Sequence, residues 1–311
     1  MLKQPTADVI IRADEKRNGC WAGIVLRFML HDVGVTLVMT KNVLIVFAHP
    51  EPNSLNGSLK DVAVERLTAN GHHVVVSDLY AMKFKAVADG SDFLKRADVN
   101  RLNYMEESRK AYEGGTQASD IMAEQAKLND ADAVIFQFPM WWFSMPAILK
   151  GWVERVLAAG FAYGVGQFGN GRWGDRYGEG KLMGRRAMLS LTCGGPAWQF
   201  GSRGVNGALD DLLFPIQHGV LFYPGMQVLP PFVIFQARRQ TVEDWPRIKA
   251  EYEKRLDNLF TDAPIPFRLQ NGGHYDDHQV LKSGLGAGES GARIHLVQPG
   301  DPPQKLPPST G

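Results

Sequence analysis

The fold is decided first by residues 43–69, VLIVFAHPEPNSLNGSLKDVAVERLTA. The apolar run Val43–Ala48 is typical of a parallel strand that is covered on both faces and therefore shows no polar alternation. From Ser54 to Ala69 apolar residues recur at helical spacing, and Gly71 follows the last of them. Strand, loop and helix together predict the first βα unit of an α/β fold.

The same alternation continues to residue 260. Further strands are predicted at Val74–Val76, Ala133–Phe138, Ala187–Thr192 and Val228–Phe235. Later helices are predicted at Asp120–Leu128, Ala147–Ala159, Asn206–Phe222 and Glu243–Phe260. Five strands that alternate with helices predict a doubly wound, five-stranded parallel sheet with helices on both faces.

Other segments of the chain do not follow this pattern. Residues 1–40 lack a clean period, so we expect either an over-long translation or disordered extension before a start at Met39, or an irregular arm. Residues 41–262 form the predicted α/β domain, interrupted by a glycine-rich loop at 160–184. Beyond residue 262 the composition turns to Pro, Gly and polar residues, which predicts an extended C-terminal arm and a disordered tail over 263–311.

The composition excludes several classes of protein. The 311 residues are 44% apolar and include 34 basic and 33 acidic residues, with neither sign in a long block, so no nucleic-acid partner is expected. Cys20 and Cys193 lack CxxC spacing, which argues against a disulfide framework or a zinc ribbon and favours the cytoplasm. The apolar run Cys20–Leu26 is too short to span a membrane, and no signal peptide pattern is found.

Ligands of a doubly wound sheet bind beyond the carboxyl ends of the strands, near the point where the strand order reverses. The first loop there, Ala48–Asn56, leads into a helix N-terminus, which attracts phosphate. Its candidate phosphate or ribose contacts are His49, Asn53, Ser54, Asn56 and, in the helix, Ser58. The alternative is that Ser54 only caps the helix, a role worth about 1 kcal/mol.

Two more loops follow buried strands. Residues 138–146 cluster three aromatic residues between two prolines, and these rings would either pack a planar cofactor or belong to the core. Residues 192–196 contain Gly194 and Gly195, where a backbone is able to approach a ligand closely. Cys193 beside them is either a reactive thiol or a small buried spacer.

Two other motifs are set aside. Residues 164–169, GVGQFG, match GxGxxG, but no strand leads into them and no helix follows, so the dinucleotide-binding context is missing. Residues 274–278, HYDDH, have residue types that bind metals but no partner cluster, so we expect a polar surface segment.

Four stretches of the domain, in chain order, are VLIVFAHPEPNSLN, VVVSDLYAM, AVIFQFPMWWFSMPAILKGWVERVL and LSLTCGG. Together they resemble the NAD(P)H:quinone oxidoreductase family, the DT-diaphorase-like enzymes of flavodoxin-like fold, over about residues 41–260. The resemblance implies non-covalently bound FAD, NAD(P)H as co-substrate and a homodimer with active sites at the subunit interface. It also implies two-electron hydride transfer through flavin N5 to quinones in a ping-pong cycle.

The resemblance assigns residues position by position. The pyrophosphate and adenosine side of FAD would be lined by His49, Ser54, Leu55, Asn56 and Ser58, with Asn103 where the family has a glutamine. The isoalloxazine would be bordered by Pro139, Met140, Trp141, Trp142, Phe143, Thr192, Cys193, Gly194 and Gly195. The substrate pocket would comprise Trp142, Phe143, Phe200 and Asn206, with Tyr163 and Tyr223 contributed by the partner subunit.

The resemblance gives the catalytic positions to Gly195, Phe200 and Asn206, and two of these depart from the best-known member. That member has Tyr and His where this chain has Phe200 and Asn206. The tyrosine half of the proposed charge relay is absent, because phenylalanine has no proton to donate, whereas Asn206 still donates a hydrogen bond. Hydride transfer needs no protein base, since orientation of the rings supplies much of the rate, so we expect the chemistry to survive.

The remaining departures concern metals and the pocket rim. Some relatives hold a structural metal with His and Cys; His218 matches one ligand but Phe222 replaces the next, so no metal is expected. The loop after Phe161–Tyr163 is longer here, through residues 172–177, and is expected to reshape the rim of the pocket. Two alternatives stay open: a nitroaromatic or azo reductase with the same machinery, and a regulatory flavoprotein such as a potassium-efflux ancillary subunit.

Overall fold

The computed structural model describes residues 39–169 and 171–307. The compact unit that contains the sheet begins at Thr40. The hypotheses about residues 1–38 and Cys20, and about the last four residues of the tail, lie outside the described residues. In the part of the chain that is described, no helix is long and apolar enough to cross a membrane.

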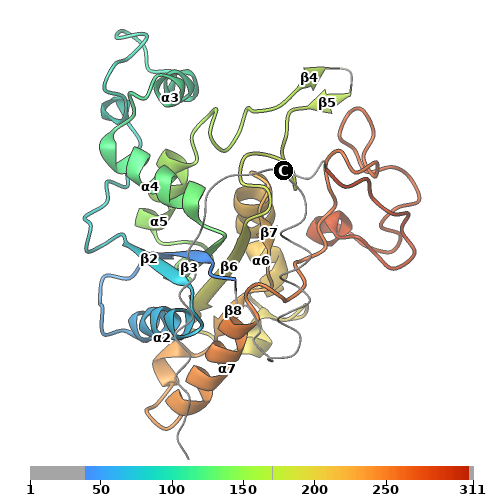
Figure 1. Ribbon diagram of the computed structural model, residues 1–311. Helices are drawn as coiled ribbons and strands as arrows, with labels where there is room; N and C mark the ends of the chain where they lie inside the picture. Colours follow the sequence, from blue (N-terminus) through green and yellow to red (C-terminus); the bar gives the residue numbers. More distant parts are fainter. Residues whose placement is uncertain (1–38, 170, 308–311) are drawn as a thin grey trace, which may run out of the picture. The chain divides into compact units, whose positions relative to one another are not determined.

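A parallel sheet forms the centre of the domain (Figure 1). Its strands are β1 (Asn42–Phe47), β2 (His73–Asp78), β3 (Ala133–Pro139), β6 (Arg186–Thr192), β7 (Gln227–Val228) and β8 (Phe232–Ile234). The strand order is β2-β1-β3-β6-β7, and β8 also pairs with β6, so the order reverses between β1 and β3. This is the flavodoxin-like order, and it confirms the predicted fold.

The predicted fifth strand is broken into two. Residues 227–228 and 232–234 each pair with β6, but Leu229, Pro230 and Pro231 between them belong to neither strand. Proline has no N–H to donate to a sheet, so the continuous strand Val228–Phe235 was a wrong prediction. The predicted helix Asn206–Phe222 is also divided, into α6 (Leu209–Ile216) and a π-helical segment, η3 (Gln217–Phe222).

The other helices lie close to their predicted bounds. They are α2 (Leu55–Ala69), α4 (Ser119–Asp130), α5 (Ala147–Val156) and α7 (Trp245–Asp257). A further helix, α3 (Tyr104–Glu113), lies between β2 and α4, where no helix was predicted. Short 3-10 turns are η1 (Gly90–Asp92), η2 (Ala197–Phe200), η4 (Ala237–Arg239) and η5 (Gly291–His295).

Helices cover both faces of the sheet, as predicted. On one face α2 and α7 pack on strand residues that include Val43, Ile45 and Ile135. On the other face α4, α5 and α6 pack on Leu44, Val46 and their neighbours in β3 and β6. Because each face is covered, every residue of β3 and β6 is buried, which explains their continuous apolar runs.

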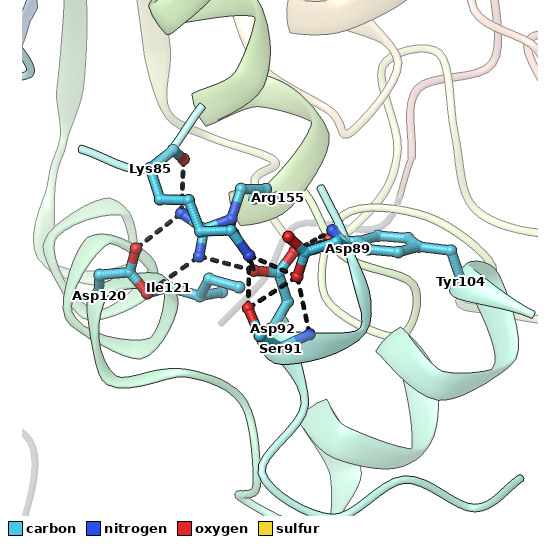
Figure 2. Close-up of polar contacts among 8 residues, drawn as sticks. All are labelled: Lys85, Asp89, Ser91, Asp92, Tyr104, Asp120, Ile121 and Arg155. Atoms are coloured by element: carbon cyan, nitrogen blue, oxygen red, sulfur yellow. Dashed lines mark hydrogen bonds and ion pairs between the residues drawn. The ribbon is translucent and has the colours of Figure 1, made fainter. Parts of the chain in front are cut away.

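A buried ion-pair network ties α3, α4 and α5 to the loop after β2 (Figure 2). The Arg155 guanidinium of α5 lies 2.9 Å from Asp92 and 2.6 Å from Asp120. Lys85 donates to Asp92 at 2.8 Å, and the Tyr104 hydroxyl donates to its other oxygen, also at 2.8 Å. These donors hold the pKa of Asp92 below its usual value although burial opposes them, so the carboxylate stays ionised.

The glycine-rich loop and the C-terminal segment meet each other. Residues 160–184 contain a short antiparallel hairpin of β4 (Phe168–Gly169) and β5 (Arg172–Trp173), which the sequence did not predict. The Trp173 indole donates a 2.9 Å hydrogen bond to the carbonyl of Asp277 in the C-terminal segment. That segment has few regular elements between residues 263 and 307, yet it buries Arg268 and His274.

Candidate functional site

The three predicted loops meet at the carboxyl ends of β1, β3 and β6. Ala48 donates its backbone N–H to Gln137 at 3.0 Å, and Met140 donates to Thr192 at 2.8 Å, so the sheet ladder continues into the loops. The rings of His49 and Trp141, from the first and second loops, have centroids 6.2 Å apart. Most of the residues that the sequence assigned to a cofactor therefore lie together at the carboxyl ends of these strands.

In the first loop, Ser54 caps α2. Its hydroxyl accepts the Gly57 N–H at 3.2 Å, so the capping interpretation is confirmed. The cap leaves the N–H groups of Leu55 and Asn56 without an intrahelical acceptor, and no acidic residue stands in the first turn to neutralise the helix end. His49 Nδ1 lies 3.0 Å from both the N–H and the carbonyl oxygen of Glu51, which ties the ring to the backbone of the loop. The loop is therefore suited to bind an anion.

A buried chain of side-chain hydrogen bonds joins the loops, and sequence reasoning missed half of it. Gln137 of β3 donates to Asn56 Oδ1 at 2.9 Å, and Asn56 donates to Thr192 Oγ1 at 2.9 Å. The Tyr252 hydroxyl of α7 lies 3.5 Å from Gln137 Oε1, at the limit of hydrogen bonding. The lone Gln137 in the apolar run VIFQFP was the signal that could have found this network.

The direction of these bonds fixes the role of Thr192. Its oxygen already accepts from Asn56, so its own O–H proton is available to donate elsewhere. Asn56 spends its carbonyl and one N–H within the protein, so it acts first as a positioning residue for the two neighbouring loops.

The second loop makes a tight turn with two bulky residues in the left-handed region. Trp141 and Ser144 exchange backbone hydrogen bonds of 3.1 and 3.0 Å, while Trp142 and Phe143 have φ of 50° and 60°. Non-glycine residues in this region are costly and tend to occur at functional sites. The Trp142 side chain is 95% exposed. The turn therefore presents aromatic rings outward, against the alternative that they belong to the core.

The third loop contains a buried thiol. Cys193 is fully buried with its sulfur 3.9 Å from that of Met140, and burial raises the pKa of the thiol to about 12. A thiol of this kind is not nucleophilic near neutral pH, so the structure supports the interpretation of Cys193 as a spacer. A methyl group added to Gly194 would meet no atom within 4 Å, so this backbone is open to a ligand.

The three predicted catalytic residues lie together. A methyl group added to Gly195 would come within 3.1 Å of Phe200 Cε2 and 3.7 Å of Asn206 Nδ2. The Phe200 ring is buried against Phe235, with centroids 5.6 Å apart, and Asn206 donates its backbone N–H to Gln199 at 3.0 Å. Phe200 and Asn206 therefore form a wall beside Gly195.

The six predicted substrate-pocket residues fall into two groups. Trp142, Phe143, Phe200 and Asn206 belong to the strand-end loops. Tyr163 and Tyr223 instead line a separate cavity of about 280 Å³ beside α5 and η3. Burial raises the pKa of the Tyr163 hydroxyl, and Tyr223 nearby adds to this effect, so the hydroxyl stays protonated at neutral pH.

Other predicted positions lie apart from the three loops. Asn103 caps α3 by accepting the Glu106 N–H at 3.4 Å, and its role beside a cofactor stays a prediction. His218 stacks on Phe214 and Tyr177 at 4.5 and 4.6 Å. Within residues 39–169 and 171–307, no group of three His, Cys, Asp or Glu side chains could hold a metal ion.

The two motifs that were set aside lie in other parts of the structure. GVGQFG runs into the β4–β5 hairpin. In HYDDH, the first residue, His274, contacts Arg268 Nη1 at 2.8 Å.

Comparison with known proteins agrees with this architecture. Residues 41–258 match the family model of the flavodoxin-like fold. A crystal structure described as that of a quinone reductase from Klebsiella pneumoniae superimposes with a TM-score of 0.81 at 50% identity, and the match covers 83% of this chain and 100% of that chain. The chain belongs to the flavodoxin-like quinone reductase family.

Relatives within the quinone reductase family are similar over the same region. A ribosyldihydronicotinamide dehydrogenase-like protein of Penicillium crustosum is 52% identical over 233 residues, or 75% of this chain and 86% of that protein. NAD(P)H dehydrogenase (quinone) 1 of Rattus norvegicus is 40% identical over 235 residues, or 73% and 80%. The resemblance found in the four sequence stretches is thus confirmed.

Proposed function

We propose that this protein is an FAD-dependent NAD(P)H:quinone oxidoreductase that acts as a homodimer. The observation that carries the proposal is the meeting of three strand-end loops at one edge of the sheet. The open end of α2 lies in the first loop and the exposed ring of Trp142 in the second. This edge combines a site for phosphate with a site for a planar ring, and FAD has both groups.

The residues present fit such a cofactor. The free N–H groups of Leu55 and Asn56 are donors suited to the pyrophosphate, and the His49 ring belongs to the same loop. The open backbone at Gly194 and the outward turn at Trp142 leave room for a flat ring. When bound, FAD would supply reversible two-electron chemistry, while the protein supplies binding, orientation and hydrogen bonds.

Phe200 and Asn206 decide how protons are handled. Neither side chain releases a proton near neutral pH, since one is a hydrocarbon ring and the other an amide. We propose that Asn206 Nδ2 donates a hydrogen bond to an oxygen of the quinone and that the proton of the product comes from solvent. Phe200 covers one side of the pocket and excludes water there.

The exposed aromatic residues support a dimer. Trp142 and Trp198 are 95% and 73% exposed, and we propose that a second copy of the chain covers them. In the proposed homodimer, Tyr163 and Tyr223 of one chain complete the pocket that Trp142 and Phe143 begin in the other. The buried free thiol of Cys193 fits the reducing cytoplasm, which we propose as the location.

The experiment that tests this function uses purified full-length protein. We expect a yellow protein whose flavin bleaches on addition of NAD(P)H and regains its colour with benzoquinone. Mass spectrometry of the released cofactor is expected to give FAD and not FMN. Protein that stays colourless after incubation with both flavins would sink the proposal.

The electron donor needs its own measurement, because the names of similar relatives include both ribosyldihydronicotinamide and NAD(P)H. Stopped-flow bleaching rates with NADH, NADPH and a dihydronicotinamide riboside would rank the three donors. If NAD(P)H is the donor, the flavin should not bleach more than tenfold faster with the riboside than with NADH or NADPH.

The two alternatives predict different results. A nitroaromatic or azo reductase would turn over those acceptors faster than benzoquinone at equal concentration. A regulatory flavoprotein would bind flavin but show negligible turnover with every acceptor.

A further inference from the structure

We propose that the protein carries a second small-molecule site, for a planar aromatic carboxylate, away from the strand-end loops. The site is a cavity of about 370 Å³ between the α6–η3 segment, residues 176–177 and the C-terminal segment. We call it the arm pocket. Its size lies in the range of known ligand pockets, and no residue of the three loops lines it, so the proposal does not depend on flavin binding.

The charges around the arm pocket are not balanced. Two guanidinium groups line it, Arg176 and Arg268, and no carboxylate does. Arg268 is neutralised by Asp301, whose oxygen lies 2.8 Å away. Arg176 has no carboxylate within ion-pair distance anywhere in residues 39–169 and 171–307, and only its Nε is bonded, to Gln270. The free edge of this guanidinium is therefore suited to a carboxylate, which it can bind through two parallel hydrogen bonds.

The walls of the arm pocket are aromatic. His218 is held between Phe214 and Tyr177, with centroid distances of 4.5 and 4.6 Å and interplanar angles of 12° and 27°. The ring centroids of His295 and His218 are 5.6 Å apart, and the Tyr275 hydroxyl lies within hydrogen-bond distance of His295 Nδ1, at 2.9 Å. A lining that includes five aromatic rings favours a flat ring over a flexible aliphatic ligand.

Two polar side chains of the lining, His218 and Gln279, are available to a ligand. His218 and Gln279 are both half-buried and line the arm pocket, and no protein hydrogen bond to either side chain is found in residues 39–169 and 171–307. Burial and the neighbouring His295 lower the pKa of His218 to about 4, so the ring is neutral near pH 7 and offers one donor and one acceptor. Their donors are therefore available to a bound carboxylate.

The test is calorimetric titration of the full-length, flavin-loaded protein with 1-naphthoate. We expect one site per chain, and binding at least tenfold weaker in the Arg176→Gln variant and in Gln279→Ala. The matched control is Arg247→Gln, which removes an exposed arginine of α7 and should leave binding unchanged. Since Gln279 is near the surface, its variant keeps the test valid even where Arg176→Gln fails to fold.

Specific outcomes would overturn the proposal. One is equal binding of the neutral 1-naphthalenemethanol, which would remove the role of the carboxylate. Another is naphthoate binding that shifts the flavin absorption spectrum and is unaffected by Arg176→Gln, which would locate the ligand at the flavin. Absence of binding heat up to the solubility limit would also end it. None of these results bears on quinone reduction, so failure here leaves the proposed function intact.

Discussion

Gln137 Nε2 lies 2.9 Å from Asn56 Oδ1, and both side chains are almost fully buried. The amide of a central strand thereby orients the amide at the first turn of α2, which in turn bonds Thr192 at the end of β6. Asn56 is thereby joined to Gln137, 81 positions away in the sequence, and to Thr192, 136 positions away. The geometry of the three strand-end loops depends on this buried polar pair.

Replacing Gln137 with Met should therefore damage both stability and flavin binding. The variant keeps the length of the side chain but leaves Asn56 Oδ1 buried without a donor, which costs about 1–3 kcal/mol. Urea unfolding measures the first effect and flavin titration of the apoprotein the second. Gln227→Met, on an exposed strand position, is the control and should change neither.

Breaking the buried ion-pair network should lower the free energy of unfolding much more than breaking a surface ion pair. Arg155→Met leaves Asp92 ionised and buried, so we expect a loss of about 3–5 kcal/mol in the free energy of unfolding. Arg66→Met removes an exposed pair with Asp257 and should cost about 0–1 kcal/mol. Similar losses in the two variants, measured by urea unfolding, would contradict the structural role of Arg155.

Cys193 should resist alkylation in the folded protein. With a pKa of about 12, about one thiol in ten thousand is ionised at pH 8, and burial further limits access. Mass spectrometry of tryptic peptides after iodoacetamide treatment separates Cys193 from Cys20. We expect labelling of Cys193 only after addition of guanidinium chloride; rapid labelling in the native protein would show that the thiol is accessible.

His218 should make the protein sensitive to mild acid. Its pKa is about 4 in the folded state against an ordinary value of 6.5, so its contribution to stability is complete above pH 6.5 and is lost as the pH falls toward 4. The variant His218→Phe keeps an aromatic ring in the stack but cannot titrate. Between pH 7 and pH 5 the urea midpoint should fall less in this variant than in the parent protein. Equal shifts would mean that His218 is not the responsible group.

Introducing Tyr and His, the residues of the best-known family member, at the Phe200–Asn206 wall should change the rate of flavin reduction. Phe200→Tyr and Asn206→His together provide a phenol and an imidazole beside Gly195, and the imidazole would introduce a pH dependence near 6.5. The parent protein should show no such step, because neither side chain titrates there. Identical stopped-flow profiles of the two proteins from pH 5 to 8 would remove these residues from the mechanism.

Much of the fold could be predicted because both faces of the sheet are covered. Covered strands are continuous apolar runs, and those at β1, β3 and β6 were found within one residue of their ends. The break at Pro230–Pro231 was missed, although proline itself is the signal. The hairpin at residues 168–173 was missed because two-residue strands carry no period.

The candidate site was predicted by position and not by contact. The sequence indicated which loops follow buried strands, and these do meet. It could not indicate that Gln137 and Tyr252 connect them, because a polar residue such as Gln137 is visible in its apolar run but its partners are distant in the sequence. The division of the predicted pocket, with Tyr163 and Tyr223 in another cavity, likewise depends on three-dimensional packing.

The turn at Trp142 and Phe143 has a consequence for anyone who engineers this protein. Asparagine or glycine would relieve the left-handed backbone there, so a selection for heat resistance alone should recover such substitutions at these two positions. The same changes would remove the outward rings. If the rings border the flavin as proposed, such variants should gain heat resistance and lose activity, so this turn is where stability and catalysis would oppose each other.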